Sequence, residues 1–312
     1  MKETNQTMPR SNGSAYRTAG DRRPQVQDRA CPLCGGTGKP WQRKRGFEID
    51  LCGSCRNAFV PRELVPNDLE SLYSTEYFEG EEGTGYPGYL NDQEIIIRNF
   101  RDRLEWIARF SPGRPRLLDV GAAYGFLLKA ARDMGWDAEG VEIAPDCAVE
   151  AARISGAPVL AGDFLSVKLR PGFDVIVMLD VIEHMRDPLA CVRRAYELLA
   201  PGGHLVIETG DHASPWARLL GERWYFLDPP QHLFYFSKRG LDWLLSRAGF
   251  APVREFHRQG RRVSLANVTF KLAAELPSSW RGSVVGATRD RLPGSLYLNF
   301  GDAMMMAAKR PA

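Results

Sequence analysis

Two pairs of cysteines stand close together near the start of the chain. Their spacing, C-x2-C-x17-C-x2-C, is typical of a tetrahedral zinc site with four thiolate ligands, here Cys31, Cys34, Cys52 and Cys55. Four protein ligands leave no coordination position for a substrate. We therefore expect a structural zinc ion that supplies folding energy to a ribbon too small to fold alone.

A second pattern joins a glycine-rich turn to a distant carboxylate. In LLDVGAAYGFLL, Asp119 ends a predicted strand, and Gly121 and Gly125 let the backbone approach a ligand closely. The helix that follows directs its positive amino end at the same space. Glu142 ends the next predicted strand and can accept hydrogen bonds from both ribose hydroxyls of an adenosine. At this point a dinucleotide enzyme and other adenosine-binding classes both remain open.

The elements that position these residues are read from hydrophobic patterning. From Arg116 onward, short apolar runs alternate with helical patterns, as in βαβ units, and the runs are apolar on both faces. This predicts a parallel α/β sheet covered by helices on both sides, with ligands bound outside the carboxyl ends of its strands. Asp187 is the predicted N-cap of one helix, with Pro188 in its first turn. The predicted strands are RLLDV, AEGVEI, PVLAG, FDVIVMLD, HLVIET, one over 253–257 and a closing one over 302–309.

Residues 94–309 together resemble the class I S-adenosylmethionine-dependent methyltransferases. Five motifs carry the resemblance, in order: the glycine-rich turn, the acid after strand two, Asp163 with Phe164 after strand three, LDVIEHMRDP after strand four, and PGG before strand five. The resemblance implies a doubly wound, mostly parallel, seven-stranded α/β sheet with a small N-terminal zinc ribbon, and S-adenosylmethionine as cofactor. It places the methionine part of the donor on the glycine-rich turn and the adenine beside Phe164.

The predicted donor site departs from the family pattern at one position. Ala123 stands where the family usually has glycine, and an alanine fits there if its φ is negative, so we still expect the donor to bind. The complete set of predicted donor-site residues is Asp119, Gly121, Ala123, Gly125, Glu142, Ile143, Asp163, Phe164 and Leu179.

Polar side chains after the fourth predicted strand are the catalytic candidates. Asp180, Glu183 and His184 lie where the methyl group of the bound donor would point, and His184 can titrate near neutral pH, which suits a general base. The segment is also similar to that of the ubiquinone-biosynthetic O-methyltransferases, in which the matching positions are associated with a divalent cation that steadies a catechol oxygen. The alternative is that these polar groups only cap the next helix.

Residues 209–236 are expected to cover the acceptor site. The segment is long, shows no clear periodicity and is too aromatic for disorder, which indicates a functional lid. It contains His212 and His232 as secondary catalytic candidates, for which a packing role is the alternative. The run PPQHLFYFS resembles a segment that recurs in bacterial class I methyltransferases with the same front ribbon.

Composition sets the remaining expectations. With 41 Lys and Arg against 38 Asp and Glu, the net charge of +3 is too small to indicate a nucleic-acid or membrane partner by itself. No apolar run reaches the ~18 residues that span a bilayer, and the start lacks a secretory signal, so we expect a cytoplasmic protein. The predicted organisation is a disordered tail over 1–30, the ribbon over 31–61, a connector and N-terminal helix over 62–110, and the methyltransferase domain over 111–312.

The expected function is methylation of a small or medium acceptor, at an oxygen of a sugar, glycan, quinone or other metabolite. Trp41, Arg43, Lys44 and Arg45 in the ribbon leave a second hypothesis open, that of an RNA methyltransferase guided by the ribbon. A third hypothesis is a non-catalytic protein that binds the donor. The identity of the acceptor and the oligomeric state are left open by the sequence.

Overall fold

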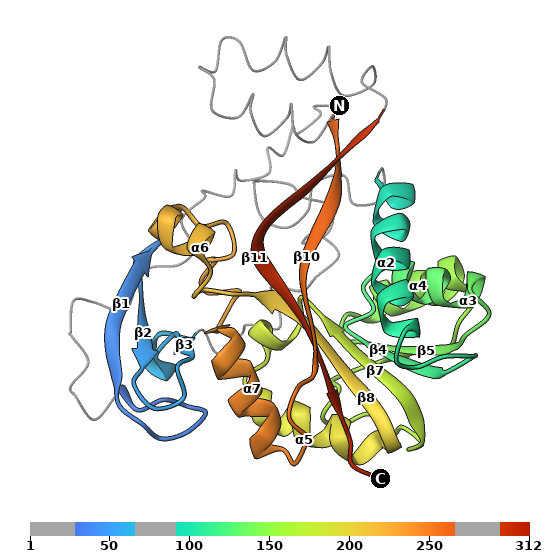
Figure 1. The fold of residues 1–312 in the computed structure, drawn as a ribbon, viewed down its shortest axis with the longest axis horizontal. Coiled ribbons are helices and arrows are strands. Elements are labelled where there is room, and N and C mark those ends of the chain that lie inside the picture. Colours follow the sequence, from blue (N-terminus) through green and yellow to red (C-terminus); the bar gives the residue numbers. More distant parts are fainter. Residues whose placement is uncertain (1–28, 66–91, 266–293) are drawn as a thin grey trace, which may run out of the picture.

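Two sheets of unequal size make up the described part of the chain. The computed structural model describes residues 29–65, 92–265 and 294–312. A seven-stranded sheet with helices on both faces stands beside a four-stranded sheet that contains the cysteine ribbon (Figure 1). The predicted tail up to residue 28 and the connector over 66–91 lie outside the described residues.

The seven-stranded sheet has the predicted doubly wound topology. Its order is β10-β11-β8-β7-β4-β5-β6, and β11 alone runs antiparallel to its neighbours. The chain moves outward from β4 in one direction through β5 and β6, and in the other direction from β7. The topological switch point, where such sheets bind ligands, therefore lies between β4 and β7. The strands are β4 (Arg116–Val120), β5 (Asp137–Glu142), β6 (Val159–Ala161), β7 (Phe173–Leu179), β8 (Leu199–Gly210), β10 (Glu255–Ser264) and β11 (Ser295–Lys309).

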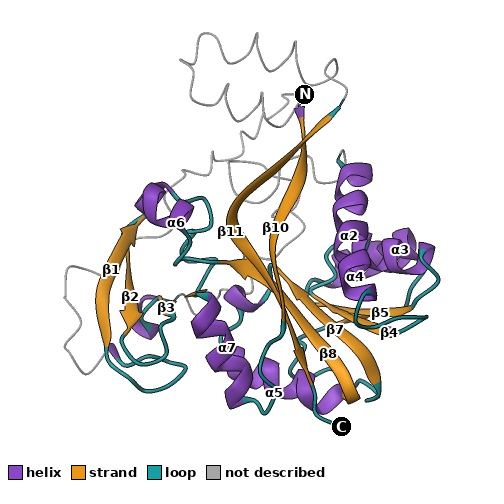
Figure 2. Ribbon diagram, in the orientation of Figure 1, coloured by secondary structure: helices purple, strands orange, loops and turns teal. Residues whose placement is uncertain are grey.

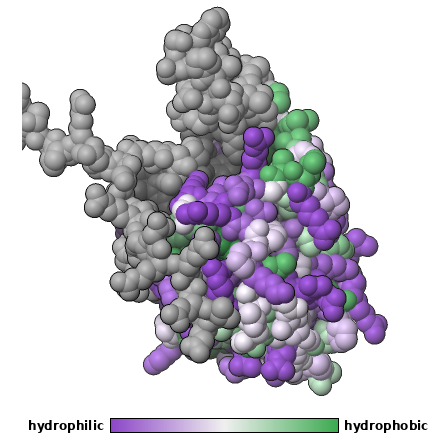
Figure 3. Space-filling view, turned by 90° about the vertical axis from the view of Figure 1, so that its left-hand side faces the viewer, coloured by the Kyte–Doolittle hydropathy of each residue, from purple (hydrophilic) through white to green (hydrophobic). Residues whose placement is uncertain are grey.

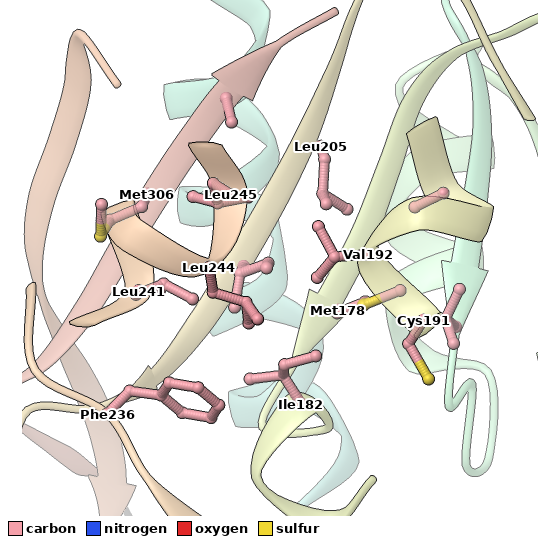
Figure 4. Packing of buried hydrophobic residues seen from close by; sticks show 14 of the residues in the cluster. Met178, Ile182, Cys191, Val192, Leu205, Phe236, Leu241, Leu244, Leu245 and Met306 are labelled. Atoms are coloured by element: carbon pink, nitrogen blue, oxygen red, sulfur yellow. The ribbon is translucent and has the colours of Figure 1, made fainter. Parts of the chain in front are cut away.

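Helices cover both faces of this sheet because its central strands are apolar on both sides. Successive side chains of a strand point to opposite faces, so Leu117 and Val177 join the cluster under α2 (Gln93–Ala108) and α3 (Phe126–Asp133). Met178 faces the opposite way, toward α5 (Pro188–Leu198) and α7 (Lys238–Arg247), in the core shown in Figure 4. Figure 2 shows α4 (Pro145–Ser155) beside α3 at the β5 edge of the sheet.

Capping residues fix where several helices begin. The side chain of Asp187 accepts a hydrogen bond from the backbone N–H of Ala190, with Pro188 in the first turn of α5, as predicted. Ser237 caps α7 by accepting from Gly240, and Ser214 caps the short helix α6 (Pro215–Leu220). These caps hold the strand-to-helix connections around the switch point.

The cysteine ribbon does not form a sheet by itself. Its strands β1 (Gly38–Lys44), β2 (Phe47–Cys52) and β3 (Ala58–Phe59) are joined by β9 (Phe234–Tyr235), which comes from the aromatic segment of the main domain. A separate buried cluster fills the space between them and mixes the two parts of the chain: Phe47, Ile49, Ala58 and Val60 from the ribbon with Ala217, Trp224, Phe226, Leu227 and Tyr235. The ribbon is thus packed onto the main domain through a shared core.

The aromatic segment is more ordered than its lack of periodicity suggested. Within 209–236 the structure has α6, a 3₁₀ turn (η5, Gly221–Arg223) and β9. These elements are too short to produce a periodic pattern, and β9 pairs with a strand some 175 residues away in the sequence. Local patterning therefore could not reveal them.

The outer surface is mixed in polarity. On the face turned toward the viewer in Figure 3, hydrophilic side chains predominate over the described residues, with a few hydrophobic ones among them. Within the described ranges, no helix combines the length and the apolar character that crossing a membrane requires.

Candidate active site

A cavity of about 630 Å³ opens outside the carboxyl ends of β4, β5, β6 and β7. Its size is within the range of small-molecule and cofactor sites. Every predicted donor-site residue except Gly125 lines it, and so do Asp180, Glu183, His184 and His232. The structure therefore brings the donor-side and catalytic candidates, which come from four strand ends and the aromatic segment, to one place.

Glu142 is held rigidly at one side of the cavity. Its carboxylate is buried and accepts backbone N–H bonds from Ala123 at 2.7 Å and from Ala144 at 3.0 Å. Burial raises its pKa, and these two hydrogen bonds oppose the rise because they favour the charged form. A carboxylate has about four lone-pair sites, so two contacts leave capacity for ribose hydroxyls.

The backbone conformation of the glycine-rich turn differs from the prediction at Ala123. Ala123 has a φ of +47°, in the left-handed region, whereas we expected a negative φ at this alanine. The turn adopts this conformation while its N–H reaches Glu142. Gly125, with a φ of +74°, has a packing role, because a Cβ there would lie 2.7 Å from the carbonyl oxygen of Ala151 in α4. Gly121 does line the cavity, and its φ is +78°.

Asp119, at the end of β4, is buried beside Glu142. Burial, and secondarily the Glu142 carboxylate, raises the pKa of Asp119 to about 7. A cation placed against this pair would offset both effects and favour the ionised form.

His184 and His232 form a pair in the lining of the cavity. His184 ends the 3₁₀ turn η4 (Ile182–His184) after β7, and His232 precedes β9. Their ring centroids are 4.7 Å apart in an edge-to-face arrangement. Nδ1 of His184 lies 3.0 Å from the carbonyl oxygen of Gln231, and Nδ1 of His232 lies 2.6 Å from that of Phe226. Since a carbonyl only accepts, each Nδ1 is assigned the proton, and each Nε2 carries the lone pair.

The prediction that His184 titrates near neutral pH is wrong. Burial, reinforced by the neighbouring His232, lowers the pKa of His184 to about 3, and burial lowers that of His232 to about 4. Both imidazoles are therefore neutral at pH 7. That is the form in which a histidine can accept a proton or bind a metal ion.

Glu183 completes a compact group with the two histidines. One ligand atom each from Glu183, His184 and His232 lie within 4.8 Å of one another. Glu183 is fully buried, and among the described residues neither of its carboxylate oxygens has a hydrogen-bond partner of ordinary geometry. Burial, and then Asp180, raise its pKa well above the usual range. Two imidazole nitrogens and a carboxylate form a donor set that suits a divalent cation, and here His232 takes the place that the resemblance gave to Asp180.

Asp180 lines the cavity from a strained backbone. Its φ of +54° is uncommon outside glycine and turns the side chain into the cavity just after β7. The residue is exposed to the cavity, and partial desolvation by the cavity walls, together with Glu208, raises the pKa of Asp180 to about 7 although Arg103 and Arg261 oppose the rise. Asp180 is therefore a second group near the reacting centre that titrates close to neutrality.

Several lining residues were not identified from the sequence. Arg103 of α2 forms a buried two-pronged ion pair with Glu208 of β8, at 2.6 and 2.5 Å. A signal was present, because Asn99 and Arg103 are polar residues one turn apart on the buried stripe of the predicted helix. Tyr225, Phe226, Arg261 and Arg262 also line the cavity. The first two come from the predicted lid, whereas the arginines come from β10, for which no motif pointed to the site.

The four ribbon cysteines have the geometry of a tetrahedral metal site. Their sulfurs lie within 4.8 Å of one another, with Cys31 to Cys55 at 3.7 Å and Cys34 to Cys52 at 3.4 Å. Zinc–sulfur bonds of about 2.3 Å place tetrahedral ligands about 3.8 Å apart, so the sulfurs fit. All four are free thiols, and the hydrogen bond between Cys31 and Cys55 lowers the pKa of Cys55 and raises that of Cys31, as expected of two sulfurs that share one proton.

His212 lies away from the cavity, between the ribbon and the main domain. Its Nε2 is 3.1 Å from the carbonyl oxygen of Arg56, and its ring packs at 5.0 Å against Trp41. Lys44 donates to the carbonyl oxygen of Trp224, and Arg45 pairs with Asp228. Three of the four ribbon residues behind the RNA hypothesis thus contact the protein's own main domain.

Comparison with known proteins agrees with this geometry. A family model described as a methyltransferase domain matches residues 93–255, just over half of the chain. The ubiquinone biosynthesis O-methyltransferase of Xanthomonas axonopodis pv. citri is 33% identical over 116 residues, which cover 34% of this chain and 48% of that protein. The protein of the same name from Ralstonia nicotianae is 28% identical over 115 residues, with the same coverage. The chain spans about half the length of these curated relatives.

One solved structure shares the fold over most of the chain. Magnesium protoporphyrin IX methyltransferase from Synechocystis PCC 6803, with bound S-adenosylhomocysteine, superposes with a TM-score of 0.50. The match covers 78% of this chain and 98% of that one at 13% identity, so the likeness concerns the fold alone.

Proposed function

The chain belongs to the family of methyltransferase domains, and we propose that it transfers a methyl group from S-adenosylmethionine to an oxygen of a small or medium acceptor such as a sugar, glycan or quinone. One arrangement carries this proposal. The carboxylates of Asp119 and Glu142 and the His184–His232 pair line the same cavity.

The donor side of the cavity suits a cationic nucleoside. Glu142 takes the ribose hydroxyls, Phe164 packs beside the adenine, and Asp119 faces the positively charged methionine part on the glycine-rich turn. Asp163, Ile143 and Leu179 complete this wall. The methyl group on the sulfonium is thereby directed at the space in front of Asp180 and His184. There an acceptor oxygen can approach the methyl carbon in line with the carbon–sulfur bond.

His184 is the proposed base. Its Nε2 accepts the proton of the acceptor hydroxyl while the oxygen forms a bond to the methyl carbon and the carbon–sulfur bond breaks. The products are the methylated acceptor, S-adenosylhomocysteine and a proton that the imidazolium passes to solvent. The low pKa that burial gives to His184 keeps the imidazole unprotonated before reaction, but it also makes the imidazole a weak proton acceptor.

A divalent cation on Glu183, His184 and His232 is the alternative form of the same site. The buried carboxylate of Glu183, which interacts with Thr209 but makes no hydrogen bond of ordinary geometry within the described residues, and the Nδ1–carbonyl bonds that fix the two imidazoles support it. Such an ion would lower the pKa of a coordinated hydroxyl and replace the strong-base step. A second metal, a zinc ion on the four cysteines, would be structural, because those sulfurs leave no open position.

The decisive experiment supplies the purified protein with isotopically labelled S-adenosylmethionine and a fractionated bacterial metabolite extract. Transfer of label to a small molecule, at an oxygen identified by mass spectrometry, supports the proposal. Label in RNA, with a steep dependence of binding on salt, would favour the ribbon-guided RNA enzyme instead. Binding of S-adenosylhomocysteine without turnover on any fraction would identify a non-catalytic donor-binding protein.

A further inference from the structure

The wall of the cavity that faces the donor comes from one segment of the aromatic region. Residues 224–236 contribute Tyr225, Phe226 and His232 to the cavity and end in β9. Each of these side chains is positioned by a stretch of chain with few helical or strand hydrogen bonds of its own. What holds this segment therefore decides where His232 lies.

The ribbon holds the end of the segment through a relay of backbone hydrogen bonds. Beside the β3–β9 pairing, the N–H of Val60 donates to the carbonyl oxygen of Leu233 at 2.9 Å. The N–H of Leu233 in turn donates to the carbonyl oxygen of Glu183 at 2.8 Å. Leu233, the residue after His232, thus bridges the ribbon to the turn that carries Glu183 and His184.

The ribbon also holds the beginning of the segment. At the tip of its β1–β2 hairpin, Lys44 donates to the carbonyl oxygen of Trp224 at 3.1 Å, and Arg45 pairs with Asp228. The residue Phe226, between these two contacts, supplies the carbonyl oxygen that orients Nδ1 of His232. The ribbon therefore contacts the segment that carries His232 on both sides of that residue.

The second cysteine knuckle fixes the ribbon in this position. Directly after Cys55, the carbonyl oxygen of Arg56 accepts from Nε2 of His212 at 3.1 Å and from the hydroxyl of Ser237 at 3.2 Å. The next residue, Asn57, is fully buried and donates to the carbonyl oxygen of Gly240 at 3.1 Å. These contacts require the knuckle to be folded, and a ribbon of this size folds with its metal.

We propose that the ribbon supports, from outside the cavity, the segment 224–236 that lines its acceptor half, and that a metal ion on its four cysteines sets the position of His232 and Glu183 through the backbone of Leu233. The inference rests on the proposed function in treating this half as the acceptor side. Val60 and Leu233 are then positioning residues, and the ribbon acts on the reacting centre of its own chain.

The test uses the chain's five histidines as reporters. NMR of the histidine-labelled full-length protein is compared with that of the double variant Cys34→Ser, Cys52→Ser in the same metal-containing buffer, so that only the ribbon site is changed and a cation held by Glu183, His184 and His232 is common to both samples. Signals of His212, His232 and His184 should shift or broaden in the variant. His204 and His257, which contact Phe110 and Trp106 on the α2 side of the sheet, should stay in place. Affinity for S-adenosylhomocysteine should change less than twofold.

Each other result overturns the proposal. Movement of His212 alone would show that the contact ends at the knuckle, and movement of none would show that the metal does not position the wall. Movement of all five with loss of S-adenosylhomocysteine binding would show that the ribbon holds the whole domain. None of these readouts needs an acceptor, so a failure of the proposed methyl transfer is detected separately.

A wedge variant separates the ribbon's position from its metal content. A Cβ on Gly240 would lie 1.8 Å from Oδ1 of Asn57, so Gly240→Ala should push the knuckle off α7 with zinc still bound. It should shift the His212 and His232 signals, and Asn57→Ala in the same chain should restore them by making room. Arg239→Ala, at the exposed neighbouring position, is the matched control. A wedge that moves neither signal would contradict the proposal.

Discussion

The backbone N–H of Ala123 donates a hydrogen bond to Oε2 of Glu142 at 2.7 Å, from a residue whose φ is +47°. The turn proposed to hold the donor and the carboxylate proposed to bind its ribose are therefore joined directly. Strain in the turn is offset by a hydrogen bond to a buried charged group, which is stronger than a bond between neutral groups.

Removal of this carboxylate should weaken donor binding. Glu142→Ala is expected to lower the affinity for S-adenosylhomocysteine more than tenfold, by about 1.5 to 3 kcal/mol, because a charge-assisted contact to the ribose is lost. Calorimetry measures the change. Glu150→Ala, at a half-buried acid on α4 that pairs with Arg153 and does not line the cavity, should bind like the wild type. Equal affinities in the two variants would remove Glu142 from the donor site.

Relief of the strained backbone should stabilise the protein. Ala123→Gly is expected to raise the free energy of unfolding by about 1 kcal/mol, because an alanine in the left-handed region costs ~1 to 2 kcal/mol and glycine returns part of this as backbone entropy. Thermal unfolding should shift upward by about 2 to 4 °C. Ala122→Gly, at the buried neighbouring position without a positive φ, should lower the midpoint instead. A lower midpoint in both variants would mean that the turn is unstrained.

Donor binding should release a proton from Asp119. Its pKa of about 7 in the free protein falls when a cation of the methionine part lies beside it, so affinity should rise with pH from about 5 to 7 and then level off. Calorimetry at pH 6 in two buffers of different ionisation enthalpy measures the release. Asp119→Asn should abolish it, and a release that persists in this variant would point to Asp180 instead.

The same group has an effect of opposite sign on the stability of the free protein. The folded state holds the Asp119 proton up to pH about 7, whereas the unfolded chain loses it near its ordinary value of about 4. Between these values the folded state binds more protons, so the contribution of Asp119 to stability falls as pH rises. Asp119→Asn should remove this part of the pH dependence in denaturant titrations at pH 5 and pH 8.

The sequence predicted those site residues whose position depends on nearby parts of the chain, and it missed those that depend on contacts distant in the sequence. The glycine-rich turn, Glu142 and the Asp187 cap each follow directly from a strand that patterning predicted, and the first two lie in successive βα units, so the sequence indicated all three. The pairing of His232 with His184 depends on β9, which crosses to the ribbon and leaves no periodic trace. The low pKa of His184 follows from burial by that same segment, so it could not be read from residue type.

The last prediction concerns the chemistry of the histidine pair. His184→Ala should lower turnover ~100-fold or more with little change in affinity for S-adenosylhomocysteine, because the base acts on the acceptor and makes no contact that the donor needs.

His232→Ala separates the two forms of the site. If His184 works alone as the base, removal of His232 raises the pKa of His184, since it takes away one of the causes that lower it, and turnover falls less than in His184→Ala. If Glu183, His184 and His232 hold a cation, each single variant loses activity to a similar extent, the double variant loses little more, and elemental analysis finds a second metal beyond the ribbon's zinc. His204→Ala, a histidine on β8 away from the cavity lining, serves as the control for general effects of the substitution. Full activity in His184→Ala, with donor binding intact, would show that neither form operates and that the acceptor is activated by Asp180, the remaining group beside the methyl carbon that titrates near neutrality.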